Sequence, residues 1–338
     1  MTYYTISHNN LLEFLKSIRA QGKKLIAPQQ REQKIFFMET DDVSSIVFDY
    51  IQTSISPKDI LFPRVEPLIT YELTADALQV NDRAEQLPSI STVLFGARPC
   101  DAVALTMLEK FFAEEPGDPF VEKRAKQLTV ISVSCSKVDS YCFCTSVGVS
   151  PGDTRGSDIL LTPCENNEYY VEVLTEKGND LVQKSQNLFN KSEKKEKEKY
   201  LANVSSDIPA EEISKRLENA FNNPLWNEAS LRCIGCGTCA YVCPLCSCFD
   251  IEDEGTQKCG TRLRCWDSCG FALFTMHTSG HNPRRTQSER WRQRVLHKFS
   301  YLPQRVQVFG CVGCGRCSRA CPVDMNLKEQ LQLIKEAL

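Results

Sequence analysis

Apolar positions in the first part of the chain follow helix spacing in some segments and strand spacing in others. Asn10 is predicted to cap a helix that ends at Gly22 and buries Leu11, Phe14, Leu15 and Ile18. The short runs Thr92–Phe95 and Leu128–Val133 predict strands, the second one buried and parallel. Between them, Asp101 opens a predicted helix whose apolar face carries Ala102, Leu105, Leu108 and Phe112. This order predicts a right-handed βαβ unit.

Weaker patterns of apolar residues predict further elements between residue 160 and a charged segment that begins at residue 191. Leu160–Leu161 and Tyr169–Val173 predict strands, and Asp180–Phe189 predicts a helix. Residues 191–199 form a charge run, which we interpret as a solvated helix or linker close to a domain boundary. A further helix is predicted over Ile213–Phe221. We therefore expect an α/β domain over residues 1–222 and a second domain over residues 223–338.

Composition places the chain among globular proteins. Of its 338 residues 42% are hydrophobic and 25% charged, and the net charge of -3 points to neither nucleic acid nor an anionic membrane as a partner. The unusual feature is 18 cysteines. The start of the chain has no pattern of a signal peptide, and no apolar stretch reaches the length of a membrane span, so we expect a cytoplasmic protein. Clustered cysteines there indicate metal binding rather than disulfides.

Two cysteine motifs have the full C-x2-C-x2-C-x3-C-P spacing of 4Fe–4S ferredoxins. Their cysteines are Cys233, Cys236, Cys239 and Cys243 in the first motif, and Cys311, Cys314, Cys317 and Cys321 in the second. Three thiolates at this spacing wrap one corner of a cubane, and the glycines between them let backbone N–H groups approach its sulfides. A zinc ribbon would need only paired C-x2-C.

In two-cluster ferredoxins the fourth cysteine of each motif serves the other cluster. We therefore assign Cys233, Cys236, Cys239 and Cys321 to one 4Fe–4S cluster, and Cys311, Cys314, Cys317 and Cys243 to a second. The long insertion between the motifs, residues 244–310, does not suit a compact ferredoxin. A helical ferredoxin-like domain tolerates it, and an apolar stripe after the second motif predicts a closing helix through Leu327, Leu331, Ile334 and Leu338.

Four further cysteines are predicted to meet in the first domain. Cys100 and Cys135 each follow a predicted strand, so they lie at one carboxyl edge if those strands are parallel neighbours. Cys142 and Cys144 follow in the next loop. Four thiols at one sheet edge suit a third 4Fe–4S cluster or an all-cysteine zinc site. Buried apolar thiols are the alternative, and that is our interpretation of the isolated Cys164.

The insertion holds other polar and sulfur-bearing residues. Five cysteines lie in it, and we favour packing around the clusters over a further site: Cys246, Cys248, Cys259, Cys265 and Cys269. His277 and His281 lack the HExxH pattern, so hydrogen bonding is the default. A basic stretch runs from Arg284 to Lys298, with Trp291 inside it. It is either a solvated helix face or a set of cations near a negatively charged cluster.

The motifs of other redox chemistries are absent from the sequence. No G-x-G-x-x-G lies between a predicted strand and helix, and there is no P-loop and no pair of C-x2-C ends of the nickel type. We therefore expect a chain that moves electrons and does not itself bind nicotinamide, make H2 or reduce sulfite.

Together these residues resemble a known family. The landmarks are Arg98-Pro99-Cys100-Asp101, Cys135 with Tyr141-Cys142-Phe143-Cys144, Pro224-Leu225-Trp226, Cys243-Pro244-Leu245-Cys246-Ser247-Cys248, Trp266-Asp267-Ser268-Cys269, Gly280-His281-Asn282 and the second cysteine motif. Over nearly its whole length the chain is similar to the iron–sulfur β subunit of cytosolic NAD(P)-linked nickel–iron hydrogenases (sulfhydrogenases). It is also similar to the corresponding iron–sulfur subunit of the anaerobic sulfite reductase, whose catalytic partner depends on siroheme.

The resemblance implies a non-catalytic electron-transfer subunit of a soluble oxidoreductase complex. A flavin-bearing partner subunit would exchange electrons with NAD(P)H, and a nickel–iron hydrogenase-type partner would carry the catalysis. The same relay in anaerobic sulfite reduction is one alternative, and a redox-inactive, metal-stabilised scaffold is another. The resemblance also favours the third cluster, because Cys100, Cys135, Cys142 and Cys144 match the family pattern, whereas Cys259 and Cys265 have no counterpart in it.

Overall fold

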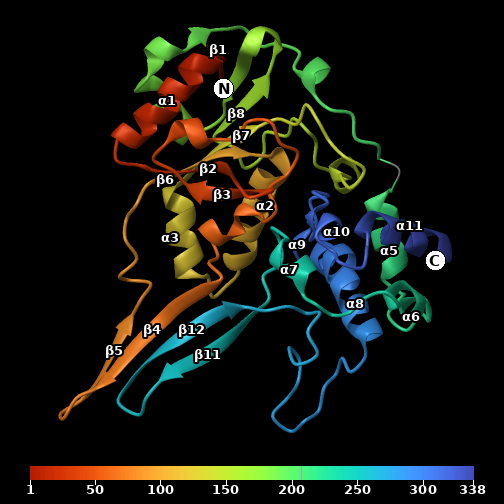
Figure 1. The fold of residues 1–338 in the computed structure, drawn as a ribbon. Helices are drawn as coiled ribbons and strands as arrows, with labels where there is room; N and C mark the ends of the chain where they lie inside the picture. Colours follow the sequence, from red (N-terminus) through yellow and green to blue (C-terminus); the bar gives the residue numbers. More distant parts are fainter. Residues whose placement is uncertain (207) are drawn as a thin grey trace.

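The computed structural model describes residues 1–206 and 208–338 (Figure 1). Two sheets and a group of helices make up the molecule. The larger, eight-stranded sheet has the order β10-β1-β9-β8-β7-β6-β2-β3. Its strands are β1 Thr2–Ser7, β2 Lys24–Arg31, β3 Lys34–Glu39, β6 Thr92–Ala97, β7 Leu128–Val133, β8 Ile159–Pro163, β9 Glu168–Val173 and β10 Asn190–Lys191.

The middle of this sheet is parallel, as the sequence predicts. β2, β6, β7 and β8 pair in parallel, and β6 and β7 align from Thr92 with Leu128 to Ala97 with Ser132. Every residue of β7 is buried, which fits its unbroken apolar and β-branched sequence. The helices of this region are α1 His8–Ala20, α2 Pro99–Phe112, α3 Pro119–Gln127 and α4 Glu176–Gln183. The α/β character of the N-terminal region is therefore confirmed.

Helix boundaries differ from the predicted ones by a few residues, for local chemical reasons. Ser7, not Asn10, caps α1, because its side chain accepts from the Asn10 amide, while Leu11, Phe14, Leu15 and Ile18 are buried as predicted. Pro99 occupies the first turn of α2, so this helix begins before Asp101. The predicted helix over Asp180–Phe189 is wrong in its position, because α4 starts at Glu176 after the cap Thr175.

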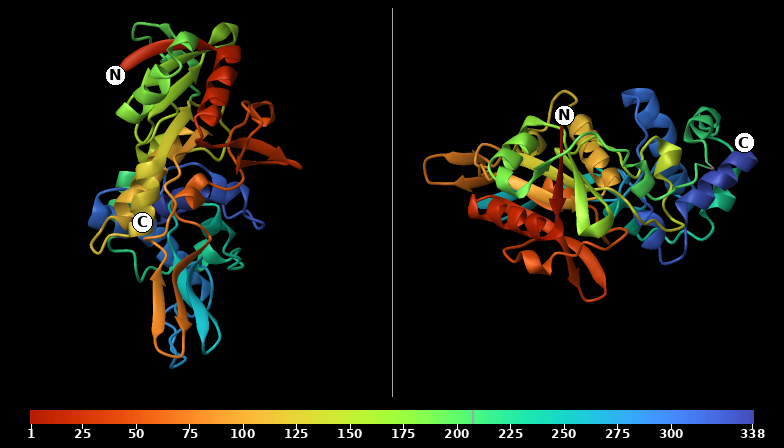
Figure 2. Two further views of the ribbon diagram at one scale, coloured as in Figure 1. Left: turned by 90° about the vertical axis from the view of Figure 1, so that its left-hand side faces the viewer. Right: turned by 90° about the horizontal axis from the view of Figure 1, so that it is seen from above.

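The second sheet joins distant parts of the chain. It has four antiparallel strands in the order β11-β12-β4-β5: β4 Val65–Leu73, β5 Leu78–Asp82, β11 Phe249–Gly255 and β12 Cys259–Trp266. β12, from the insertion between the cysteine motifs, pairs with β4 over Cys259 with Glu72 to Cys265 with Val65. The two hairpins project from the rest of the molecule (Figure 2).

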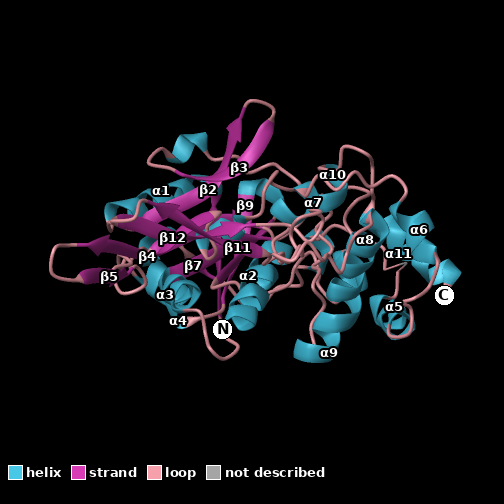
Figure 3. Ribbon diagram, turned by 90° about the horizontal axis from the view of Figure 1, so that it is seen from below, coloured by secondary structure: helices cyan, strands magenta, loops and turns pink. Residues whose placement is uncertain are grey.

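Short helices gather beside these sheets and carry the cysteine loops (Figure 3). They are α5 Ala210–Leu217, α6 Leu225–Ser230, α7 Thr238–Tyr241, α8 Gln287–Leu296, the π-helical η7 His297–Tyr301, α9 Leu302–Val306, α10 Arg316–Arg319 and α11 Leu327–Ala337. The single-turn helices are η1 Val43–Ser45, η2 Pro57–Ile60, η3 Cys144–Val147, η4 Glu165–Asn167, η5 Gln186–Leu188 and η6 Glu198–Tyr200. Among the described residues, no helix combines the length and apolarity needed to cross a membrane.

The C-terminal helices pack as the sequence pattern predicts. Helix α11 buries Leu327, Leu331 and Ile334, so the predicted closing helix is confirmed. In the charge run at residues 191–199, Lys197 pairs with Glu172 at 2.6 Å and only a single helical turn, η6, forms at its end. The boundary between residues 222 and 223 stays a prediction, and the four-stranded sheet contains strands from both sides of it.

Candidate iron–sulfur centres

The first cysteine loop lies between α6 and α7. Gly235 and Gly237 have φ of +69° and +73°, which turn the backbone around the position that the thiols face. A Cβ atom on Gly237 would lie 2.4 Å from the ring of Phe271. Glycine at position 237 therefore suits both the positive φ of the backbone and the close approach of the Phe271 ring.

One cavity gathers the thiols that we assign to the first cluster. Its lining includes Cys233, Cys236, Cys239 and Cys321, together with Cys317. Gln287 donates to the Cys233 sulfur at 3.1 Å, and the Met325 amide donates to the Cys321 sulfur at 3.2 Å. Hydrogen bonds of this kind favour sulfur in its anionic, iron-bound form. The chemistry of this donor set fits a 4Fe–4S cluster, and these four residues would hold it.

The second cysteine loop lies between α9 and α10 and is more deeply buried. Gly313 and Gly315 again have positive φ, +63° and +72°. Cys311 and Cys314 are buried, and the Gly313 amide donates to the Cys311 sulfur at 3.4 Å. Lys298 links the predicted fourth ligand, Cys243, to the start of this loop. Its ammonium donates to the Cys243 sulfur at 3.4 Å and to the Gly310 carbonyl at 2.6 Å. These contacts bring Cys243 to the second loop.

The third set of cysteines, in the N-terminal region, lies at the carboxyl ends of β6 and β7. These strands pair in parallel, so both end at the same edge of the sheet. Cys100 lies in the first turn of α2, and Cys135 follows β7. The thiols of Cys135, Cys142 and Cys144 lie close enough to influence one another electrostatically, as do those of Cys100 and Cys135. The structure thus brings together four residues that the chain separates, and their role as ligands stays a prediction.

Burial changes the acidity of these thiols. It raises the pKa of Cys135 to about 11, and the pKa values of Cys144, Cys239 and Cys311 to about 12. Desolvation disfavours the thiolate, so these four thiols are neutral at pH 7 in the absence of iron. Binding of iron must therefore release protons, and the affinity must rise with pH.

Several cations lie among the buried cysteines. Arg294 and Lys298 are 4% exposed, so the interpretation of the basic stretch as a solvated helix face is wrong for these two. Arg294 donates to the Cys246 sulfur at 3.4 Å and to the Cys239 carbonyl at 3.0 Å. Arg285, earlier in the same stretch, is exposed. The part of the stretch that faces the cysteines can offset the negative charge of a bound cluster.

A buried ion pair joins the second loop to the third set. Arg316 donates to Asp101 at 2.5 and 2.9 Å and to the Thr53 carbonyl at 2.9 Å. Asp101 is fully buried and directly follows Cys100. The local sequence pattern places Asp101 only at the start of a helix, because nothing in it shows that the partner of Asp101 lies far along the chain.

Other predicted polar residues lie away from these centres. Cys164 is half-buried and donates to the Thr162 carbonyl, Cys259 is exposed, and Cys265 lies on β12. His277 and His281 are exposed and joined through a backbone hydrogen bond of 2.8 Å. Among the described residues, no three His, Cys, Asp or Glu side chains are arranged to hold a single metal ion.

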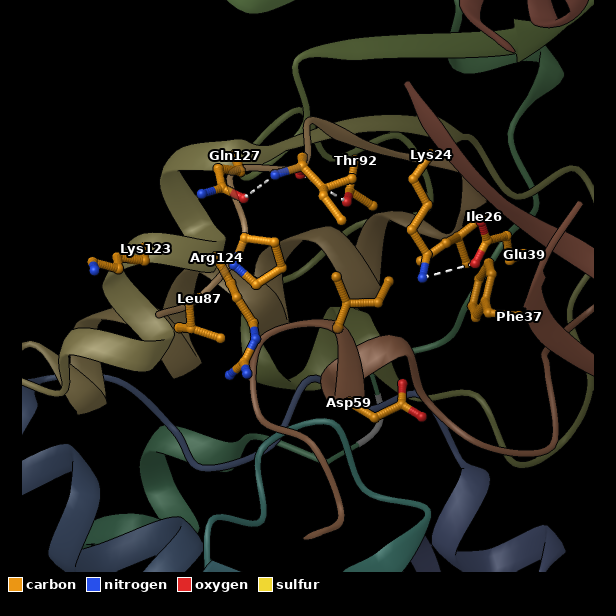
Figure 4. Close-up of a pocket in the computed structure, with 13 residues that line it drawn as sticks. Lys24, Ile26, Phe37, Glu39, Asp59, Leu87, Thr92, Lys123, Arg124 and Gln127 are labelled. Atoms are coloured by element: carbon orange, nitrogen blue, oxygen red, sulfur yellow. Dashed lines mark hydrogen bonds and ion pairs between the residues drawn. The ribbon is translucent and has the colours of Figure 1, made fainter. Parts of the chain in front are cut away.

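A separate pocket of about 380 Å³ contains no cysteine (Figure 4). It lies between β2, β3 and α3, and Lys24 pairs with Glu39 across one side at 2.8 Å. On the other side, Gln127 accepts from the Ile90 amide at 3.0 Å. Lys123 and Arg124 donate to the carbonyl groups of Ala84 and Leu61 outside the lining, and we assign the pocket no function.

Comparison with known proteins agrees with this geometry. Residues 232–325 match the family model described as a 4Fe-4S dicluster domain, which spans both cysteine loops. The chain is also 28% identical over 346 residues to sulfhydrogenase 2 subunit beta of Pyrococcus furiosus, with 100% of both chains covered. The match to the dicluster model confirms a domain with two 4Fe–4S clusters at the C-terminal end.

Proposed function

We propose that this chain, a member of the iron–sulfur β-subunit family of the sulfhydrogenases, relays electrons through three 4Fe–4S clusters between two partner subunits. One partner would carry a flavin and exchange electrons with NAD(P)H. The other would be a nickel–iron hydrogenase-type catalytic subunit. The relay moves single electrons, and the bound clusters supply the redox chemistry.

The observation that carries the proposal is that the three cysteine sets form a continuous series. The first and second loops meet where Cys239 and Cys317 lie close enough to interact electrostatically. The second loop meets the third set through the Phe143 amide, which donates to the Gly313 carbonyl at 2.9 Å. Electron transfer between clusters requires such proximity, whereas a scaffold does not.

Arginine contacts support the step from the second loop to the third set. Arg319 donates to the Cys142 sulfur at 3.3 Å and to the Cys314 carbonyl at 2.9 Å. Its guanidinium also forms a bidentate pair with Asp139, with both distances 2.7 Å. One side chain thus touches both cysteine sets, which favours a redox cluster over an isolated zinc ion at Cys100, Cys135, Cys142 and Cys144.

The first loop offers the surface for exchange with a partner. Cys236 is exposed, and the neighbouring Leu231 and Ile234 are 80% and 64% exposed. Apolar side chains around a redox centre suit a protein partner, because docking removes them from water. The name of the Pyrococcus furiosus relative favours a hydrogenase complex over a sulfite reductase. As the sequence resemblance implies, we expect the complex to be cytoplasmic.

Anaerobic purification with counting of iron and sulfide tests the proposal. Cys100→Ser should lose about four irons relative to the wild type, while the EPR signals of the reduced C-terminal clusters remain. Cys164→Ser is the matched control and should lose none. An iron count unchanged in Cys100→Ser, or zinc bound in place of iron, would refute the third cluster. A protein without any reducible chromophore would refute the relay as a whole.

A further inference from the structure

A second group of thiols lies beside the first cysteine loop, outside the three sets described above. Cys246 and Cys248 precede β11, and Cys269 follows β12. Phe249 pairs with Trp266 at the open end of the β11–β12 hairpin, away from its turn, so the cysteines flank this end. The Asp267 amide donates to the Cys248 carbonyl there at 2.9 Å. The hairpin thus brings Cys269 to Cys248.

The sulfurs of this group lie near one another. Cys248 and Cys269 lie close enough to interact electrostatically with each other and with Cys246. Cys246 in turn lies close enough to Cys243 to interact with it electrostatically. Cys246 is buried, and Cys248 and Cys269 are half-buried. Three cysteines from two separate segments therefore converge at the base of one hairpin.

Three buried cations surround these thiols. Lys58, Arg294 and Lys298 are 2%, 4% and 4% exposed. Lys58 belongs to the N-terminal region and donates to the Cys246 carbonyl at 2.8 Å and to the Ala240 carbonyl at 3.3 Å. None of the three pairs with a carboxylate in the part of the chain that the structure describes.

Buried cations without anions are costly, so this site needs negative charge. The motif clusters can supply it near Arg294 and Lys298, which contact Cys239 and Cys243. Lys58 donates to no motif sulfur: its ammonium lies 3.8 Å from the centre of the Trp266 ring and interacts electrostatically with Cys246, Cys243 and Cys248. A group bound by the additional thiols would supply the counter-charge there.

We propose that Cys246, Cys248 and Cys269 bind a further iron–sulfur cluster, next to the two clusters of the motifs. This inference rests on the proposed electron relay and adds a side position to it. It replaces our interpretation of these three cysteines as packing residues. The other two cysteines of the insertion are different, because Cys259 is exposed, and desolvation together with Glu252, Glu254 and Asp250 raises the pKa of Cys265.

Substitution on either side of the hairpin tests the site. Cys248→Ser and Cys269→Ser, purified without air, should each lose about three to four irons per chain with matching sulfide. Cys265→Ser, on the same hairpin, should lose none. The EPR signals of the motif clusters should persist in all three variants. Unchanged iron in Cys248→Ser and Cys269→Ser, with or without lower stability, would overturn the proposal, because packing residues bind no iron.

A second measurement leaves the proposed site intact, so it does not depend on the folding of those variants. Cys100→Ser removes the N-terminal set, so iron should fall from about 16 per chain in the wild type to about 12 if the further cluster exists. About 8 irons would overturn the further cluster while leaving the motif clusters in place. A chain without iron would instead refute the proposed function itself.

Discussion

The two cysteine loops share one sequence motif and one backbone conformation but have different surroundings. Both turn through two glycines of positive φ. In the first loop a Cβ atom on Gly237 would meet a side chain, Phe271, whereas on Gly313 in the second loop it would meet the Cys144 backbone at 2.5 Å. The motif therefore specifies the cluster, and the packing around it decides whether the cluster faces a partner or the interior.

Removal of iron should have the largest effect on stability. It should distinguish the cysteine loops from the eight-stranded sheet. Ligation supplies much of the folding free energy of small metal sites, on the order of 10 kcal/mol. After complete chelation, hydrogen exchange should become fast in both cysteine loops and remain slow in β6 and β7. Equal loss of protection in the eight-stranded sheet would show that the sheet depends on the clusters, and an unchanged melting profile would contradict the expected stabilisation.

Breaking the buried ion pair should come next. Arg316→Met leaves the buried Asp101 without its cation, which costs roughly 3–5 kcal/mol. The midpoint of urea unfolding, measured with the clusters bound, reports this loss. Arg305→Met is the control, because its pair with Glu114 lies at the surface and contributes about 1 kcal/mol or less.

A double variant sharpens that result. If the loss reflects an uncompensated charge, Arg316→Met combined with Asp101→Leu should be less destabilising than the sum of the two single variants. Additive losses would mean that Arg316 acts mainly through its hydrogen bond to the Thr53 carbonyl.

Alanine at the loop glycines should give smaller, graded losses. Gly148 has φ of +73° and open space around it, so Gly148→Ala measures backbone strain alone, about 1–2 kcal/mol. Gly237→Ala should cost little more, because the Phe271 side chain can move. Gly313→Ala adds a clash with backbone and should cost roughly 1–3 kcal/mol beyond the strain. Equal midpoints of urea unfolding for Gly237→Ala and Gly313→Ala would contradict the contrast between the loops.

The smallest effect on stability should come from substitutions at the exposed surface of the first cysteine loop. Ile234→Glu should change the free energy of unfolding by about 0.5 kcal/mol or less, yet slow electron exchange with the partner subunits. Leu78→Glu, on the distant hairpin, is the matched control and should leave that rate unchanged. Stopped-flow reduction of the assembled complex measures both, and equal rates would place the exchange surface elsewhere.

The sequence predicts best what depends on neighbours along the chain. The β6–α2–β7 order and the buried face of α1 follow from local periodicity, and the cysteine spacing predicts both loops. Lys58 shows the limit, since it lies on a short helix with no pattern of its own and reaches the Cys246 carbonyl only because distant strands pair. The β4–β12 pairing was missed for the same reason: no local signal links residues so far apart.

The shared four-stranded sheet has a consequence for synthesis of the protein. β4 leaves the ribosome early but cannot pair with β12 until residue 266 has emerged. At about 5–20 residues per second, that interval is on the order of ten seconds or more. During this time the edge of the β4–β5 hairpin is open and Lys58 lacks the carbonyl groups that later accept from it. The N-terminal cysteines and the first cysteine motif emerge within this interval, whereas the second motif emerges only after β12 is complete.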